Sequence, residues 1–213
     1  MKKPLAGIIN ISINNILSIK RALEFVGFEI KIVSENQNID KFDLIVLPGV
    51  GAFNEAMNKL KSSKLLLTVE NSIEKNKNFL GICLGMQLLF KKSEEFGNTK
   101  GIGYFDGVIE NFNKFNVERK TFIGWNKVKF LKKNDKKNIL EKFNLKNNNF
   151  YSIHSFFANC KDENDKLATS KNGKLEYTCC VKKNNVTAFQ FHPEKSGING
   201  LELLKVSTLN IFN

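Results

Sequence analysis

The chain has 213 residues, of which 42% are hydrophobic and 25% are charged, and its formal net charge at pH 7 is +12. This length and composition suit one domain over residues 1–213 with a single core, and they exclude a disordered or collagen-like chain. The charge does not indicate nucleic-acid binding, because only Arg21 and Arg119 among the 33 basic residues are arginines, the lysines are scattered, and no nucleic-acid-binding motif accompanies them.

Strand-like runs alternate with helical stretches in the first half of the chain, a pattern typical of parallel strands joined by crossover helices. The predicted strands are Leu5–Ile11, Phe28–Ile32, Phe42–Leu47 and Phe79–Ile82. The predicted helices are Ile16–Val26, Phe53–Leu60 and Leu84–Phe90. The longest uncharged stretch, Pro4 to Ile19, is shorter than the roughly 20 apolar residues that span a bilayer. We therefore expect no membrane partner and a cytoplasmic location.

The pattern changes to shorter strand-like pieces from about Gly101. Two of them are predicted at 122–125 and 150–156, on either side of a Lys/Asn-rich stretch, 132–149, which we expect to be a surface loop with one helical turn. The runs 175–181 and 186–191 flank two asparagines that tolerate positive φ, which predicts a hairpin. A helix over 200–212 closes the chain. Together these elements predict an α/β sandwich.

The sequence Gly81-Ile82-Cys83-Leu84-Gly85 has the pattern of a nucleophile elbow with cysteine as the nucleophile. Such a turn strains the nucleophile's backbone, and flanking glycines remove the β-carbons that would clash where strand and helix meet. The backbone N–H groups that follow favour a thiolate and supply part of an oxyanion hole. A lone cysteine is more often a buried structural thiol, but the paired glycines favour a nucleophile. The adjacency of Cys179 and Cys180 argues against a disulfide framework.

A cysteine nucleophile needs a base, and the chain has two histidines, His154 and His192. Proline biases His192 in His192-Pro193-Glu194 towards an extended backbone, in which residues two apart share a side, so that Glu194 can orient the imidazole. We therefore predict a catalytic set of Cys83, His192 and Glu194. No carboxylate is near His154 in sequence, so it is either a substrate or interface contact or a satisfied structural histidine.

The segment Pro48-Gly49-Val50-Gly51-Ala52-Phe53 also follows a predicted strand and opens a helix. A phosphate-binding loop would occupy the same context, but the Gly-Lys-Ser/Thr ending and the third glycine of a dinucleotide fingerprint are missing. The alternative use of this loop is to supply backbone N–H groups that stabilise an oxyanion beside Cys83.

These motifs together resemble the class I glutamine amidotransferases. Four blocks carry the resemblance: Leu47–Phe53, Gly81–Phe90, Gly124–Val128 and Phe191–Gly197. The elbow and the His-Pro-Glu are general to the class. The Pro-Gly-Val-Gly-Ala-Phe loop, the Gly-Trp-Asn and the trailing Lys195-Ser196 resemble its subgroup of glutaminase subunits of imidazole glycerol phosphate synthases. The resemblance spans nearly the whole chain and implies a flavodoxin-like sandwich whose central sheet is mostly parallel and flanked by helices.

The resemblance also implies roles for individual residues. Cys83 would attack the side-chain amide of glutamine to form a glutamyl thioester, and His192 would deliver a proton to the departing ammonia before water hydrolyses the thioester. The implied substrate-binding residues are Val50, Gly51, Leu84, Gln87, His154 and Ser155. The residues implied near the ammonia exit towards a partner are Trp125 and Lys195. We expect no cofactor and no metal ion.

The partner implied by the resemblance is a (β/α)₈ cyclase subunit in a heterodimer, which receives ammonia through a tunnel and uses it in histidine biosynthesis. Two segments depart from the family pattern. Asn10–Asn15 stands where Asp-Tyr-Gly-x-Gly-Asn is usual, and Thr121-Phe122 stands where Pro-His is common. Neither segment touches the predicted catalytic set, so both bear on the identity of the partner.

Three alternatives stay open at the level of sequence. A paralogous subunit would supply ammonia to another acceptor, for example an amidated surface sugar. A stand-alone cysteine-elbow hydrolase or deglycase would need no partner. A non-enzymatic basic module would use its charge to bind an acidic protein.

Overall fold

The structure, a computed structural model, describes residues 2–11, 16–35, 37–131 and 148–212. Within them, one sheet has the strand order β2-β1-β3-β4-β13-β12-β10-β7-β5-β6, and β11, β8 and β9 branch from β12. Most of the predicted loop 132–149, with its helical turn, and most of the divergent segment Asn10–Asn15 lie outside the described residues.

Five neighbouring strands form a parallel core, and they are β1 (Leu5–Ile9), β2 (Glu29–Val33), β3 (Leu44–Gly49), β4 (Asn78–Cys83) and β13 (Val186–Phe189). Every residue of β3 is buried. Such a continuous apolar run is typical of a parallel strand covered on both faces, which is why the sequence shows no alternation there.

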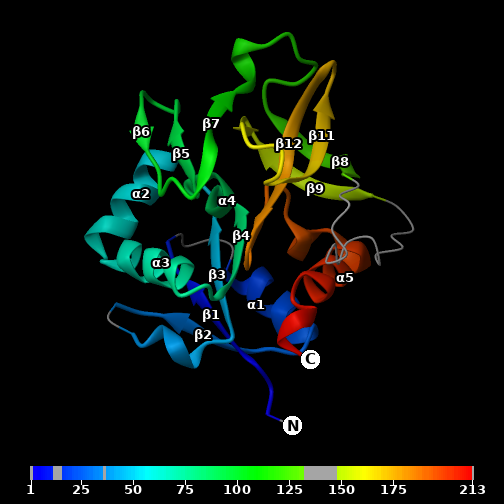
Figure 1. The fold of residues 1–213 in the computed structure, drawn as a ribbon. Coiled ribbons are helices and arrows are strands. Elements are labelled where there is room, and N and C mark those ends of the chain that lie inside the picture. The colour runs from blue at the N-terminus through cyan, green and yellow to red at the C-terminus, as the bar shows by residue number, and fades with distance from the viewer. Residues whose placement is uncertain (1, 12–15, 36, 132–147, 213) are drawn as a thin grey trace.

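Helices cover both faces of this parallel core (Figure 1). They are α1 (Ile16–Phe25), α2 (Phe53–Ser62), α3 (Leu65–Glu74), the short α4 (Leu84–Leu88) and α5 (Gly197–Ser207). Apolar side chains of α1 and α5 pack in one core cluster, and those of α2 and α3 pack in another on the opposite face. The α/β class with helices flanking the sheet is therefore confirmed. No helix in the described parts of the chain has the length and apolar character that crossing a bilayer requires.

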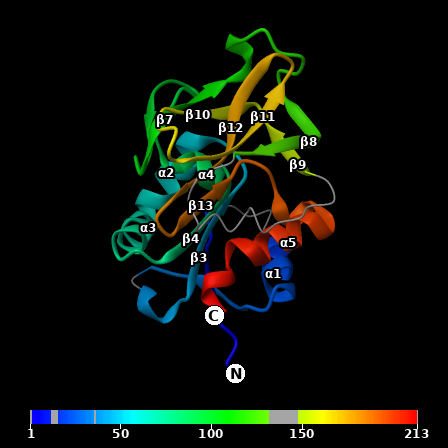
Figure 2. The same ribbon diagram turned by 45° about the vertical axis from the view of Figure 1, so that its right-hand side comes forward.

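The second half of the chain adds mostly antiparallel strands, which lie together beyond one end of the parallel core (Figure 2). They are β5 (Phe90–Ser93), β6 (Thr99–Lys100), β7 (Phe105–Asn111), β8 (Phe122–Phe130), β9 (Asn149–His154), β10 (Phe156–Cys160), β11 (Lys166–Asn172) and β12 (Leu175–Lys183). The predicted hairpin is confirmed, because β12 and β13 pair antiparallel across a turn in which Asn184 has φ +50°.

Two predicted helices are wrong in their bounds. The helix predicted over Leu84–Phe90 ends at Leu88, because Phe90 instead opens β5 and pairs with Phe105. The closing helix runs over Gly197–Ser207 and is followed by a 3₁₀ turn at Leu209–Ile211. Helix α3 was not predicted at all, although its buried positions recur at helical spacing.

Candidate active site

Cys83 occupies the sharp turn between β4 and α4, with φ +55° and ψ −110°. A residue with a side chain rarely adopts this conformation, so the surrounding structure must hold it there. A β-carbon on Gly85 would lie only 1.8 Å from the carbonyl oxygen of Leu47. A β-carbon on Gly81 would lie 2.9 Å from that of Ala188. The two glycines therefore let strand, turn and helix approach closely enough to form the elbow.

The register of the parallel strands brings three strand ends to the same place. Gly49 at the end of β3 lies opposite Cys83, and Phe189 at the end of β13 lies opposite Ile82. The loop after β3, the elbow and the segment after β13 therefore meet at the carboxyl edge of the parallel strands, where open α/β sheets place their binding sites.

The imidazole of His192 is fully buried beside the carboxylate of Glu194, with Nδ1 2.7 Å from Oε1. Its backbone N–H donates to the carbonyl of Tyr151 at 2.8 Å. Burial acts to lower the pKa of His192, but the charge and hydrogen bonding of Cys83 and Glu194 outweigh burial and raise that pKa to about 10. The structure thus brings the predicted catalytic set together. The carboxylate holds one ring nitrogen, and the thiol lies within reach of the imidazole.

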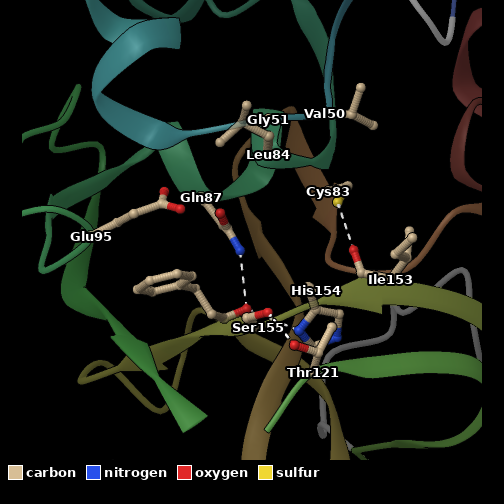
Figure 3. A pocket seen from close by; sticks show the side chains of 11 residues that line it. Val50, Gly51, Cys83, Leu84, Gln87, Glu95, Thr121, Ile153, His154 and Ser155 are labelled. Atoms are coloured by element: carbon tan, nitrogen blue, oxygen red, sulfur yellow. Dashed lines mark hydrogen bonds between the residues drawn. The ribbon is translucent and has the colours of Figure 1, made fainter. Parts of the chain in front are cut away.

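A cavity of about 310 Å³ opens beside the sulfur of Cys83 (Figure 3). Its lining residues are Val50, Gly51, Cys83, Leu84, Gln87, Glu95, Thr121, Ile153, His154, Ser155 and Phe156. All six predicted substrate-binding residues are among them. The loop that contains Val50 and Gly51 faces the same cavity as the sulfur, which fits the oxyanion interpretation of this loop better than phosphate binding.

Two polar residues of the cavity were not predicted, Glu95 and Thr121. Glu95 lies in the turn between β5 and β6, and its carboxylate accepts a hydrogen bond from the backbone N–H of Phe53 at 2.7 Å. Burial raises the pKa of this carboxyl group. The hydroxyls of Thr121 and Ser155 are 2.8 Å apart. Tertiary structure brings both residues to the cavity. No local motif marks Glu95 in the sequence, and Thr121 stands out there only as part of the divergent segment Thr121-Phe122, which the sequence relates to the partner and not to the cavity.

His154 lines the cavity while both of its ring nitrogens have partners in the fold. Nδ1 lies 2.9 Å from the carbonyl oxygen of Phe156, which can only accept, so Nδ1 carries the proton. Nε2 lies 3.5 Å from the hydroxyl of Tyr177. Burial is the largest effect and lowers the pKa of His154 to about 4. The imidazole is therefore neutral at pH 7, and its role in substrate binding stays a prediction.

We expect His154 to make the fold sensitive to acid. In the unfolded chain its pKa is near 6.5, so between pH 6.5 and about 4 the unfolded chain binds a proton that the folded chain does not. The free energy of unfolding should therefore decrease as the pH is lowered through this window, by on the order of 3 kcal/mol from this group alone. Urea denaturation between pH 7 and 4.5 should show a shallower dependence for His154→Gln. Equal slopes would contradict a neutral, buried imidazole.

The residues predicted near the partner lie at the surface. Trp125 is 57% exposed and its ring meets Tyr151 edge-on at 6.4 Å. Ile123 lies two residues earlier on β8, opposite Ile153 of β9. Lys195, one residue after Glu194, is also exposed. The paired strands thus carry an apolar face that continues to the cavity through Ile153, which is both a cavity residue and exposed.

The family model of class-I glutamine amidotransferases matches residues 8–210. The chain belongs to this family. It is 39% identical over 200 residues to "Imidazole glycerol phosphate synthase subunit HisH" of Caldanaerobacter subterraneus subsp. tengcongensis, and this match covers 93% of the present chain and 95% of the relative. It is 41% identical over 200 residues to "Imidazole glycerol phosphate synthase subunit HisH 2" of Vibrio vulnificus, covering 93% and 91% of the two chains.

A solved structure supports the fold of this amidotransferase. The chain in "Structure of PurLQS from Thermotoga maritima" matches with a TM-score of 0.76 at 21% identity, and the match covers 100% of both chains. At such low identity the match concerns the fold alone. The class I amidotransferase fold implied by the sequence motifs is therefore confirmed.

Proposed function

We propose that this amidotransferase is the glutaminase subunit of an imidazole glycerol phosphate synthase and supplies ammonia for histidine biosynthesis. The observation that carries the proposal is the sulfur of Cys83, strained at the end of β4, in reach of an imidazole whose other nitrogen is bound to Glu194. The curated relatives named above, about 40% identical over nearly their full length, supply the biological context.

The cavity has polar groups suited to the ammonium and the carboxylate on the α-carbon of an amino acid. At one point of its wall lies the carboxylate of Glu95, which would attract an ammonium group. At another point lie the paired hydroxyls of Thr121 and Ser155, of which one donates to the other and the second would donate a hydrogen bond to a carboxylate. A glutamine held by these two groups at its α-carbon would extend its side-chain amide towards the part of the wall where the sulfur of Cys83 lies.

The reaction then has two halves. The sulfur of Cys83 attacks the carbon of the side-chain amide, and the oxyanion that forms is stabilised by N–H groups of Leu84 and of the loop with Val50 and Gly51. The carbon–nitrogen bond breaks as the protonated His192 gives its proton to the leaving nitrogen, which departs as ammonia. A water molecule, deprotonated by the same imidazole, attacks the thioester and releases glutamate and the thiol. Glu194 holds the ring in place throughout.

The apolar face formed by Ile123, Trp125, Tyr151 and Ile153 is where we propose that a cyclase subunit docks. A large exposed aromatic residue at the centre of an apolar patch is the kind of side chain that dominates binding energy in protein interfaces. Because Ile153 also lines the cavity, a partner on this face would cover the cavity from which ammonia leaves. Exposed Lys195 would lie beside this route.

The docking proposal is tested by reconstitution with the cyclase of the same organism. We expect Trp125→Ala to weaken the complex at least about tenfold, since interface hot spots exceed about 1.4 kcal/mol. Isothermal titration calorimetry measures this affinity. Phe25→Ala is the matched control, because Phe25 is 75% exposed on α1 and lies outside this face. Equal affinity of the wild-type chain and Trp125→Ala would contradict the docking face, and no binding of the cyclase at all would contradict the proposed partner.

A further inference from the structure

Gln190 is a buried residue beside the elbow, and it belongs neither to the catalytic set nor to the proposed substrate-binding residues. It follows β13 directly, and the pairing of Phe189 with Ile82 places it alongside Cys83. Its side chain is fully buried, and Nε2 lies 3.9 Å from the sulfur of Cys83. Its backbone N–H donates to the carbonyl of Cys179 at 2.9 Å, which fixes the main chain at this position. The amide is therefore directed at the reacting atom from within the core.

The hydrogen-bond chain behind Gln190 determines which end of its amide meets the sulfur. Gln87 Nε2 donates to the carbonyl oxygen of Phe156 at 3.1 Å, and a carbonyl oxygen can only accept. The second proton of the same nitrogen points to Gln190 Oε1 at 3.0 Å. With its oxygen committed to Gln87, Gln190 must present its N–H to Cys83. Two buried amides thus link the carbonyl of Phe156 to the sulfur: Gln87 Nε2 donates to both Phe156 and Gln190, and Gln190 Nε2 donates to Cys83.

We propose that Gln190 is a further functional residue of this site, whose amide N–H stabilises the negative charge on the sulfur of Cys83 and holds that sulfur towards the cavity. A hydrogen bond to an ionised acceptor is about twice as strong as one between neutral groups, so the bond favours the thiolate over the thiol. The amide itself does not titrate, so it stabilises the charge wherever the sulfur is ionised. The inference rests on the proposed function in one respect, that Cys83 is the nucleophile.

The direct readout is the alkylation of Cys83 by iodoacetamide, followed by peptide mass spectrometry on the full chain without glutamine. Only the thiolate reacts, so the rate as a function of pH reports the ionisation of this sulfur. The other three cysteines are each at most 2% exposed. Burial is the main cause that raises the pKa of Cys160 to about 11 and also raises the pKa of Cys179. Peptide mapping separates Cys83 from Cys160 and from the adjacent Cys179 and Cys180, which share one peptide.

Gln190→Leu removes the donor while keeping most of the volume. We expect it to slow alkylation at pH 7 about tenfold and to move the pH profile upward by about one pH unit. Gln190→Glu keeps the shape of the side chain but places a carboxylate against the sulfur, so the displacement should be larger. The matched control is Gln37→Leu, the same change at a glutamine whose side chain accepts a hydrogen bond from the backbone N–H of Ser34, in a loop away from the cavity.

A merely structural role for Gln190 would lower stability without moving the pH profile. Profiles of Gln190→Leu and Gln190→Glu that coincide with that of the wild-type chain would therefore overturn the inference. If the leucine variant does not fold, the glutamate variant decides alone. Failure of this inference can be distinguished from failure of the proposed function. A wild-type chain that does not hydrolyse glutamine with its cyclase would refute the function, and the alkylation profiles would still compare Cys83 in the wild-type chain with Cys83 in the Gln190 variants.

Discussion

Cys83→Ala should abolish glutamine-dependent synthesis by the complex with the cyclase, by at least about a thousandfold, because removal of a nucleophile eliminates the covalent route. Ammonia-dependent synthesis by the same complex should be unchanged, since the second reaction takes place on the partner. Steady-state rates with glutamine and with an ammonium salt above neutral pH measure the two activities separately.

The control for this substitution is Cys160→Ala, the same change at a buried cysteine on β10 whose sulfur lies 3.5 Å from the carbonyl oxygen of Asp162 and outside the cavity. It should keep both activities. Loss of the ammonia-dependent rate in Cys83→Ala would contradict separate sites for the two reactions. Retention of the glutamine-dependent rate would remove Cys83 from the mechanism.

Gly85→Ala adds a single methyl group, and among glycine-to-alanine changes near the site it should destabilise the fold most. Its β-carbon would lie 1.8 Å from the carbonyl oxygen and 2.7 Å from the carbonyl carbon of Leu47. Both atoms belong to the backbone of β3, so relief requires α4 to move away from the sheet. We expect a loss of about 3 kcal/mol in the free energy of unfolding, measured by urea denaturation, together with loss of glutaminase activity.

Gly97→Ala separates this clash from the general effect of replacing glycine. Gly97 has φ +108°, but nothing lies within 4 Å of an added β-carbon. The cost there should be limited to the backbone conformation, about 1 kcal/mol, and the activity should persist. Equal destabilisation by the two substitutions would show that close packing of the elbow against β3 does not determine its geometry.

The elbow could be recognised in the sequence because its requirements are local. Strand, cysteine, glycines and helix are consecutive, and the structure shows the positive φ and the close approach to Leu47 that such a motif needs. The same is true of His192 and Glu194, which are two residues apart. Features of this kind follow from bonded geometry and short-range sterics, so a single sequence contains the information.

Residues that tertiary structure brings to the site could not be found in this way. Glu95 reaches the cavity by a turn between β5 and β6 and caps the backbone of Phe53, 42 positions away. Gln190 meets Cys83 across a separation of 107 positions because two parallel strands share a register. Strand order determines such contacts.

The apolar run after Leu84 shows that secondary structure, too, can depend on distant residues. Its apolar residues suit a helix or a strand equally well. The run is helical to Leu88, and the pairing of Phe90 with Phe105 begins a strand at Phe90.

The central claim is that Cys83 attacks the side chain of glutamine, and covalent labelling with a diazo-ketone analogue of glutamine tests it most directly. The chain in complex with its cyclase should take up one equivalent, peptide mass spectrometry should find it on Cys83, and excess glutamine should slow the labelling. Label on another residue, or labelling of Cys83 that glutamine does not slow, would contradict the claim.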